Sequence, residues 1–228
     1  MDFLRPARPV PLSLVAGQGH YEAVVEAVLA ARRSVWIATA NLKELMVRDA
    51  RLVPGRRRTA KGSYRSVLER FAELVRAGVE IRILHAGEPS RAFREELARQ
   101  PELSRERGFE LRRCPRVHLK VVLVDAERVY LGSANWTGAG LGAKGEGRRN
   151  FELGLVSSDE LLVDEATALV EHVWRGAACK GCKLKDLCPA PLDGSGVRPA
   201  AAPATPKPAA PQRARARASR RRSGPGAS

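Results

Sequence analysis

The sequence has 228 residues, which allows one medium-sized α/β domain with appendages and excludes two full catalytic domains. Hydrophobic residues make up 44% of the chain, so a wholly disordered protein is also excluded. Lys and Arg outnumber Asp and Glu by 40 to 25, giving a formal net charge of +15. A surplus of this size predicts a polyanionic partner, either nucleic acid or an anionic membrane surface.

The apolar runs of the sequence are too short to cross a membrane. The longest, such as residues 121–124, are far below the ~20 residues that a transmembrane helix needs. Residues 1–11 lack the continuous apolar stretch of a signal peptide. We therefore expect a cytoplasmic protein with no membrane partner, in which clustered cysteines favour metal binding over disulfides.

The sequence divides into three parts: a main domain of residues 1–176, a Cys-rich knuckle of residues 177–189 and a basic tail of residues 190–228. The tail is built from Pro, Ala, Arg, Ser and Gly, with eight Lys or Arg against the single acid Asp193. This composition predicts disorder. The tail is either a solvated linker end or a basic arm that adds nonspecific affinity for nucleic acid, and its dense arginines favour the arm.

Helical and strand patterns alternate along the first part. In chain order they predict a helix over 21–33, a strand over 34–40, a helix over 63–77, a strand over 79–84, a helix over 90–98, strands over 109–113, 117–124, 128–135 and 151–156, and a helix over 159–174. Alternation of this kind predicts an α/β fold in which a β-sheet is covered by helices.

One predicted hairpin carries the candidate chemistry. Side chains alternate along a strand, so His118 and Lys120 share one face of the first strand, while Ser133 and Asn135 share one face of the second. A turn at residues 126–127 sets Lys120 opposite Ser133 and His118 opposite Asn135. Paired positions lie only ~5 Å apart, so the four groups would surround a single small anion.

These residue types suit phosphoryl chemistry. A histidine offers a nucleophile or proton carrier, a lysine offers a point charge, and serine and asparagine offer neutral donors. Polar groups gathered on a strand face without a ligand would be costly, which favours a site. Asp125 lies ~16 Å along the strand from Lys120 and has the opposite parity, so we expect it to fix the turn through local hydrogen bonds.

The spacing of these residues is also a family signature. The pattern HxKxxxxDxxxxxxGSxN is matched in full by His118, Lys120, Asp125, Gly132, Ser133 and Asn135. It resembles the phospholipase D superfamily, in its single-motif, nuclease-like branch, and implies that family's fold, a mixed β-sheet flanked by helices, over residues 12–176. That family carries a carboxylate or amide on a neighbouring strand downstream. Glu152 stands at that place, and the alternative is a surface glutamate on an edge strand.

The resemblance implies phosphodiester cleavage in two steps, without a catalytic metal. His118 would attack phosphorus to form a phosphohistidine, and a second His118 would protonate the leaving oxygen and then activate water or an alcohol. Lys120 and Asn135 would stabilise the transition state with help from Ser133, and Glu152 would orient the imidazole. Since one chain supplies one motif, this mechanism implies a homodimer with the active site on its twofold axis.

Two basic loops are candidates for substrate contact. The segment 48–62 is rich in arginine, and the segment 138–147 contains five glycines and precedes two arginines. Charged loops of this kind are either solvated or substrate-binding. The candidate binding residues are Arg56, Arg57, Arg58, Lys61, Arg148 and Arg149.

The cysteines form a second candidate site. Cys179, Cys182 and Cys188 follow the spacing Cys-x₂-Cys-x₅-Cys, which resembles the C-terminal iron–sulphur knuckle of RecB-type nucleases. The resemblance implies a fourth ligand far upstream, for which Cys114 is the candidate, with His172 as a substitute. Inert thiols are the alternative, and spacing alone fits a structural zinc ion and an iron–sulphur cluster equally.

Three functions follow from these features. The first is a nuclease acting on DNA or RNA, favoured by the basic charge and loops. The second is a phospholipase D-type phospholipid phosphodiesterase, which the same His–Lys chemistry could serve. The third is an inactive nucleic-acid-binding module, which the intact motif disfavours.

Overall fold

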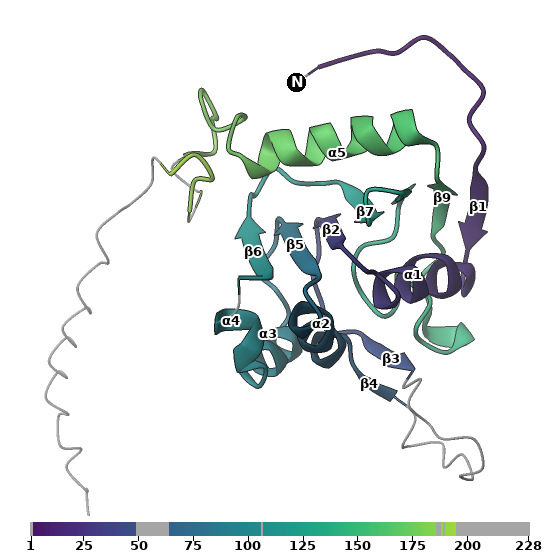
Figure 1. Cartoon of the computed structure of the whole chain (residues 1–228), viewed down its shortest axis with the longest axis vertical. Coiled ribbons are helices and arrows are strands. Elements are labelled where there is room, and N and C mark those ends of the chain that lie inside the picture. The colour runs from purple at the N-terminus through teal and green to yellow at the C-terminus, as the bar shows by residue number, and fades with distance from the viewer. Residues whose placement is uncertain (1, 49–63, 106, 186–187, 189, 195–228) are drawn as a thin grey trace, which may run out of the picture. The chain divides into compact units, whose positions relative to one another are not determined.

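The computed structural model describes residues 2–48, 64–105, 107–185, 188 and 190–194 (Figure 1). Its elements are β1 (Ser13–Ala16), the π-helical turn η1 (Tyr21–Val25), α1 (Glu26–Leu29), β2 (Ser34–Thr39), β3 (Met46–Arg48), β4 (Tyr64–Ser66), α2 (Val67–Arg76), β5 (Glu80–His85), α3 (Arg91–Ala98), α4 (Pro101–Arg105), β6 (Phe109–Arg113), β7 (Lys120–Val124), β8 (Arg128–Gly132), η2 (Glu146–Arg148), β9 (Leu153–Ser157) and α5 (Glu160–Trp174).

A seven-stranded mixed sheet organises the fold, in the order β1-β9-β8-β7-β2-β5-β6. Strands β2, β5 and β6 run parallel, and β7, β8, β9 and β1 join antiparallel. Along β2, Val35 and Ile37 pack with α1 to α4, whereas Trp36 and Ala38 pack with α5. Helices therefore cover both faces of the sheet (Figure 1), which confirms the predicted α/β fold.

Three helices begin where a short polar side chain caps them. Ser66, Ser90 and Asp159 each accept a hydrogen bond from a backbone N–H of the first turn of α2, α3 and α5. The predicted helix over 63–77 starts too early, because the segment just before the cap pairs with β3 as the short strand β4. Among the described helices, none is long and apolar enough to cross a membrane.

The catalytic hairpin differs from its prediction by one residue. Its turn spans residues 125–127, with φ values of +57° at Asp125 and +56° at Ala126, and Val124 pairs with Arg128. Continued to the end of β7, this register brings Gly132 rather than Ser133 opposite Lys120. The strands are also shorter than predicted, since β7 begins at Lys120 and β8 ends at Gly132. His118, Ser133 and Asn135 consequently lie in the flanking loops.

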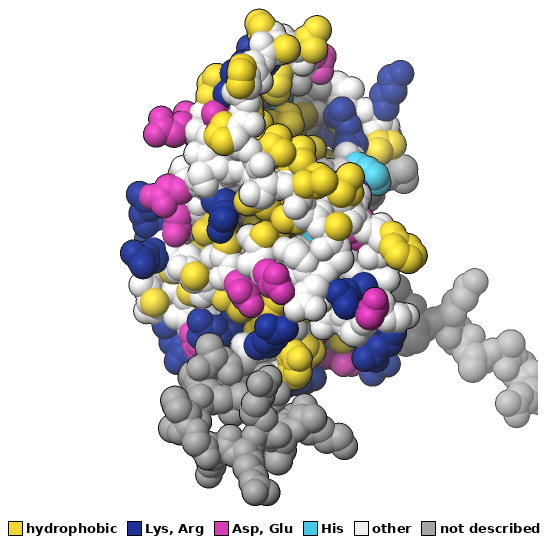
Figure 2. All heavy atoms as spheres, turned by 90° about the vertical axis from the view of Figure 1, so that its right-hand side faces the viewer, with side chains coloured by type: hydrophobic (Ala, Val, Ile, Leu, Met, Phe, Trp, Pro, Cys, Tyr) yellow, Lys and Arg dark blue, Asp and Glu magenta, His cyan; other side chains and the backbone are white. Residues whose placement is uncertain are grey.

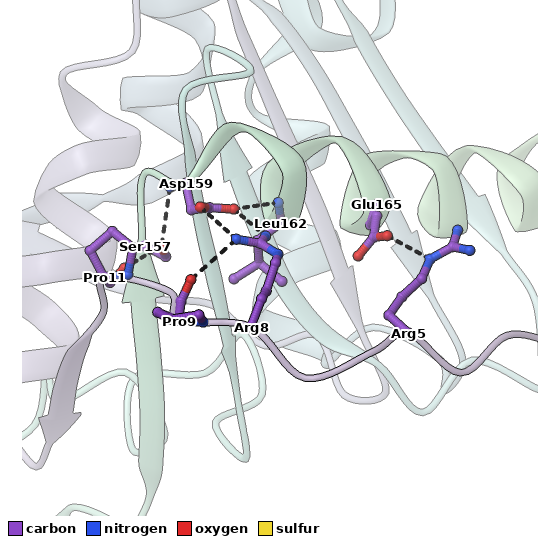
Figure 3. A network of polar contacts seen from close by, with 8 residues as sticks. All are labelled: Arg5, Arg8, Pro9, Pro11, Ser157, Asp159, Leu162 and Glu165. Carbon is purple, nitrogen blue, oxygen red and sulfur yellow. Dashed lines mark hydrogen bonds and ion pairs between the residues drawn. The ribbon is translucent and has the colours of Figure 1, made fainter.

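The N-terminal segment runs along α5 before it enters the sheet as β1 (Figure 3). Arg8 contacts both carboxylate oxygens of Asp159, at 2.9 and 2.5 Å, and Arg5 pairs with Glu165 at 2.6 Å. The Arg8 guanidinium lowers the pKa of Asp159 to about 2. The Ser157 hydroxyl donates to the carbonyl of Pro11 at 2.6 Å. These contacts fix the β1–β9 edge of the sheet.

The chain turns back after the knuckle. Gly176 ends α5 with a φ of +74°, and a Cβ there would lie 2.3 Å from the backbone of Asp193. Leu192 packs against the apolar cluster under α5. Residues 190–194 therefore belong to the folded body, which moves the start of the predicted tail beyond residue 194. The remaining tail and the predicted contacts Arg56, Arg57, Arg58 and Lys61 lie outside the described residues.

Candidate active site

His118 and Lys120 contact each other where β7 begins. The Lys120 ammonium lies 3.2 and 3.3 Å from the two ring nitrogens of His118 and donates to the His118 carbonyl at 2.9 Å. The imidazole is exposed, whereas the lysine is half-buried. A phosphoryl group bound to the His118 ring would therefore lie next to the positive charge of Lys120.

Asn135 reaches the same end of the sheet through Thr39. Thr39 ends β2 and pairs with Lys120 across the sheet. Its hydroxyl lies 3.3 Å from Asn135 Oδ1, which accepts the backbone N–H of Asn41 at 3.0 Å. Because these donors fix the carbonyl oxygen of the amide, its Nδ2 hydrogens remain for a bound anion.

The buried Tyr130 of β8 explains the glycines beside it. A Cβ on Gly132 would lie 2.2 Å from Tyr130 Oη, and a Cβ on Gly154 would lie 2.2 Å from its Cε2. The phenol accepts the Ala134 N–H at 3.3 Å, and burial raises the pKa of Tyr130 to about 12. The glycine of the motif thus makes room for the ring that holds the turn leading to Asn135.

Ser133 and Glu152 form the other half of the site. The Ser133 hydroxyl donates to one oxygen of Glu152 and accepts the Leu153 N–H at 3.1 Å. Asn150 Nδ2 donates to the second oxygen of Glu152 at 3.1 Å. The described contacts therefore join Ser133 to Glu152 and His118 to Lys120, but none joins Glu152 to His118. The orienting role predicted for Glu152 remains a proposal.

Asp125 lies at the far end of β7, away from these groups. Its carboxylate accepts backbone N–H groups of residues 32–34 at 2.7 to 3.1 Å. Burial opposes ionisation of this carboxyl, but the three donors and the Arg33 charge outweigh it, so the pKa of Asp125 is lowered. Its place off the catalytic patch agrees with the prediction, whereas its partners are more than 90 residues distant rather than local.

Two polar pockets adjoin the site. One, of about 190 Å³, is lined by Asn135 together with Lys43, Lys144 and Asn150. The other, of about 170 Å³, shares Lys144 and adds Arg48, Tyr21, Tyr64 and the predicted binding residue Arg149. Arg148 is exposed on η2. Lys43, Lys144, Arg48 and Arg149 thus place positive charge in the pockets beside the motif, together with the acidic Glu44 in the first.

Sequence reasoning did not single out Thr39, Asn41, Lys43 or Lys144. Thr39 has one signal that could have been used, because it is the polar residue that ends an otherwise apolar strand. Lys43 and Lys144 come from segments about 100 residues apart. The parallel bridge of Leu42 with Trp136, in which the Lys43 N–H donates to the Trp136 carbonyl at 3.1 Å, brings the two segments together beside Asn135.

All four cysteines are free and half-buried. They line one pocket of about 390 Å³ together with Val117, His118 and Leu119. His172, the substitute ligand, does not line it. Among the described residues, no three His, Cys, Asp or Glu side chains are placed to hold a single metal ion.

Comparison with known families decides the assignment. The family model described as "Cardiolipin synthase, PLD-like domain" matches residues 24–174, which is more than half of the chain. The chain belongs to the phospholipase D-like family. Members of this superfamily are phosphodiesterases, and the matched residues contain the whole HxKxxxxDxxxxxxGSxN motif. No curated protein matches the phospholipase D-like chain significantly.

Solved structures with a similar fold include two from bacteria. NucT from Helicobacter pylori is 15% identical, with a TM-score of 0.48 over 72% of this chain and 94% of that one. Nuc from Salmonella typhimurium, a phospholipase D family member, is 19% identical, with a TM-score of 0.46 over 71% and 91%. The archaeal chromatin protein TrmBL2 is 15% identical, with a TM-score of 0.46 over 72% and 52%.

Proposed function

We propose that the protein is a nuclease that cleaves DNA or RNA through a phosphohistidine, at an active site shared by two copies of the chain. The observation that carries this proposal is the contact of the Lys120 ammonium with the His118 ring, beside an Asn135 amide whose oxygen accepts the Asn41 N–H. The flanking cations Lys43, Lys144 and Arg149 favour a substrate with several phosphates.

The chemistry follows from these groups. A ring nitrogen of His118 attacks phosphorus, the bond to the leaving oxygen breaks, and the partner's His118 gives that oxygen a proton. The partner's His118 then removes a proton from water, which attacks phosphorus and breaks the P–N bond. Lys120 and the Asn135 amide stabilise the negative charge that develops on the phosphoryl oxygens in both steps.

An exposed apolar strip supports the shared site. Leu14 of β1 pairs with Leu155 of β9, and their side chains are 66% and 37% exposed. Leu153 and Phe151, next to Glu152, are also exposed. Figure 2, which views the molecule from the β1 side of Figure 1, shows hydrophobic side chains across this face. A second copy covering this strip would lie beside the catalytic residues.

A phospholipid substrate is the second candidate, because the same strip would also suit acyl chains. The test compares wild-type protein with His118→Ala on labelled single- and double-stranded DNA, RNA and phosphatidylcholine vesicles, all in EDTA. The control is His172→Gln, which changes a histidine in the last turn of α5.

We expect nucleic acid to be cleaved in EDTA, with a loss of at least about 10³-fold in His118→Ala and none in the control. Acid-labile, base-stable phosphate trapped on wild-type protein identifies the phosphohistidine. Cleavage of phosphatidylcholine alone would select the lipid candidate. Activity within tenfold of wild type in His118→Ala would remove this histidine from the mechanism.

A further inference from the structure

Four cysteines from two distant segments meet at one pocket. Cys179, Cys182 and Cys188 belong to the knuckle, whereas Cys114 follows β6, 65 residues before Cys179. The chain contains no other cysteine, and all four line the same space of about 390 Å³. Sequence spacing can group the three knuckle thiols, but only the fold adds the fourth.

Two arginines hold the end of α5 and the start of the knuckle against β6 and the segment that follows it. Arg116 donates to the carbonyl of Ala178 at 3.2 Å. Arg112 donates to the carbonyl of Trp174 at 3.2 Å, and its guanidinium lies 4.4 Å from the centroid of the Trp174 ring. These contacts hold the cysteine-bearing loop against the segment that contains Cys114.

The chain forms a tight turn at Cys179 and another at Cys114. The Cys182 N–H donates to the Cys179 carbonyl at 3.1 Å, and Gly181 between them has a φ of +72°. Only glycine adopts this conformation without strain, so the turn depends on the residue between the two cysteines. Cys114 opens a turn of its own, in which the Val117 N–H donates to the Cys114 carbonyl at 3.0 Å.

The rest of the pocket wall suits a compact, anionic, thiolate-bound group. Apolar side chains supply much of it, including Leu119, Leu169 and Val173, while Arg116 and Lys185 bring positive charge. A volume of about 390 Å³ lies at the lower end of the range of ligand pockets, ~300 to 1,000 Å³. Four thiolates gathered here need both the flanking cations and a metal to offset their repulsion.

The size of the pocket favours a cluster over a single ion. Zinc holds four sulphurs at about 2.3 Å, which places them about 3.8 Å from one another. The space that the four cysteines line, about 390 Å³, is larger than one ion between such sulphurs occupies. A cluster of several irons carries its four cysteines further apart. We propose that Cys114, Cys179, Cys182 and Cys188 hold an iron–sulphur cluster in this pocket.

The cluster has a structural role. Cys114 lies four residues before His118, and His118 itself lines the same pocket. A ligand bond to Cys114 therefore fixes the segment that leads into β7 and sets the position of the catalytic histidine. Phosphoryl transfer uses none of the cluster's irons, because the reacting groups are His118, Lys120 and Asn135.

The test begins with the full chain purified without oxygen from iron-supplied cells. We expect iron and acid-labile sulphide in equal amounts, with broad absorbance near ~400 nm that fades on reduction by dithionite. One zinc per chain with no visible absorbance would overturn the cluster. Absence of both metals, with four freely titrating thiols in the folded protein, would overturn the site.

Variants then test the ligand set. Cys114→Ser and Cys182→Ser should lose most of the absorbance and unfold at lower temperature, because each removes one ligand. Lys183→Gln, which removes an exposed charge of the knuckle at a residue that does not line the pocket, should retain iron and sulphide at the wild-type ratio. A wild-type spectrum and iron content in Cys114→Ser would exclude the upstream cysteine and overturn the four-cysteine site.

Discussion

At the scale of single residues, the catalytic groups owe their positions to neighbours that carry no chemistry. Thr39 lies against the Asn135 oxygen, and its hydroxyl also accepts the Trp136 N–H at 3.0 Å. Tyr130 holds the Ala134 N–H and requires glycine at position 132. Hydrogen bonds with Thr39 and Tyr130, which are not part of the motif, therefore position the motif segment that contains Asn135.

Asn135→Asp tests whether the amide hydrogens matter. The new carboxylate can still accept the Asn41 N–H, but it has no hydrogens for a phosphoryl oxygen and adds a negative charge. We expect kcat to fall by about 10²- to 10³-fold while the melting temperature changes little. Steady-state kinetics and thermal unfolding measured on one preparation check this. An unchanged kcat would show that Asn135 only supports the fold.

At the scale of elements, Asp125 ties the β7–β8 hairpin to the start of β2. Its carboxylate receives three backbone N–H groups from residues 32–34, and its own N–H donates to the Ser34 carbonyl at 2.8 Å. Two left-handed residues in a row shape the turn that presents this carboxylate. Asp125, a residue of the motif, thus fixes where β7 lies relative to β2.

Asp125→Asn should lower stability by about 1 kcal/mol and the melting temperature by about 2–4 °C at pH 7. Because the folded protein lowers the pKa of Asp125, the carboxylate stabilises the fold above its unfolded pKa. This contribution is lost as the pH falls through the folded-state pKa. The difference in melting temperature should therefore be largest near neutrality and disappear in acid.

The control for this variant is Glu127→Gln, which removes a carboxylate from the same turn. Within the described part of the chain Glu127 pairs with Arg33, and both side chains are more than half exposed, so the expected change is under about 0.5 kcal/mol. Activity measured well below the melting temperature should be the same in both variants. Lost activity with an unchanged melting temperature in Asp125→Asn would place this residue in the chemistry.

At the scale of the whole molecule, the proposed dimer supplies the two histidines that the mechanism needs, because each chain contributes one motif. Two copies that each supply one His118 behave differently from independent subunits when active and inactive chains are mixed. Co-expressed in equal amounts, wild-type and His118→Ala chains would leave about one quarter of the sites with both histidines. We expect activity per chain to fall to about one quarter.

Independent active sites would instead leave about half the activity of the wild-type protein, and this result would contradict the shared site. A parallel mixture with His172→Gln chains should keep full activity. Sedimentation of both mixtures checks that the chains assemble to the same size, so that the activities compare like with like.

The predicted role of the basic tail belongs to the same scale, because it depends on charge. Residues 195–228 contain eight Lys or Arg and no acidic residue. Deleting them should weaken nucleic-acid binding and reduce the slope of log K against log salt by ~0.9 for each lost contact with duplex phosphate. The rate of the chemical step at saturating substrate should not change.

A matched variant of the tail keeps its length and removes its charge, with Gln at the six arginines between 213 and 222. It should show the larger part of the same loss of affinity and slope, measured by a salt titration of binding. If the truncated and wild-type proteins have equal affinity and slope, the tail makes no contact with phosphates.

The sequence by itself determined the α/β class, most elements and the identity of the motif residues, because these depend on local periodicity, capping and fixed spacing. It also placed Asp125 off the catalytic patch, from its distance along the strand and its strand parity. It missed the hairpin register by one residue, since two left-handed residues and distant backbone donors decide that turn. Local pattern carries no information about such partners.

Only the tertiary structure decided which distant segments meet. The pairing of β2 with β7 brings Thr39 to Lys120 and Asn135, and the docking of the knuckle brings Cys114 to the other three cysteines. These meetings depend on sheet order and on packing against α5, which are set by the burial of whole elements rather than by neighbours in the chain. For that reason the residue types of both sites could be read from the sequence, but their geometry could not.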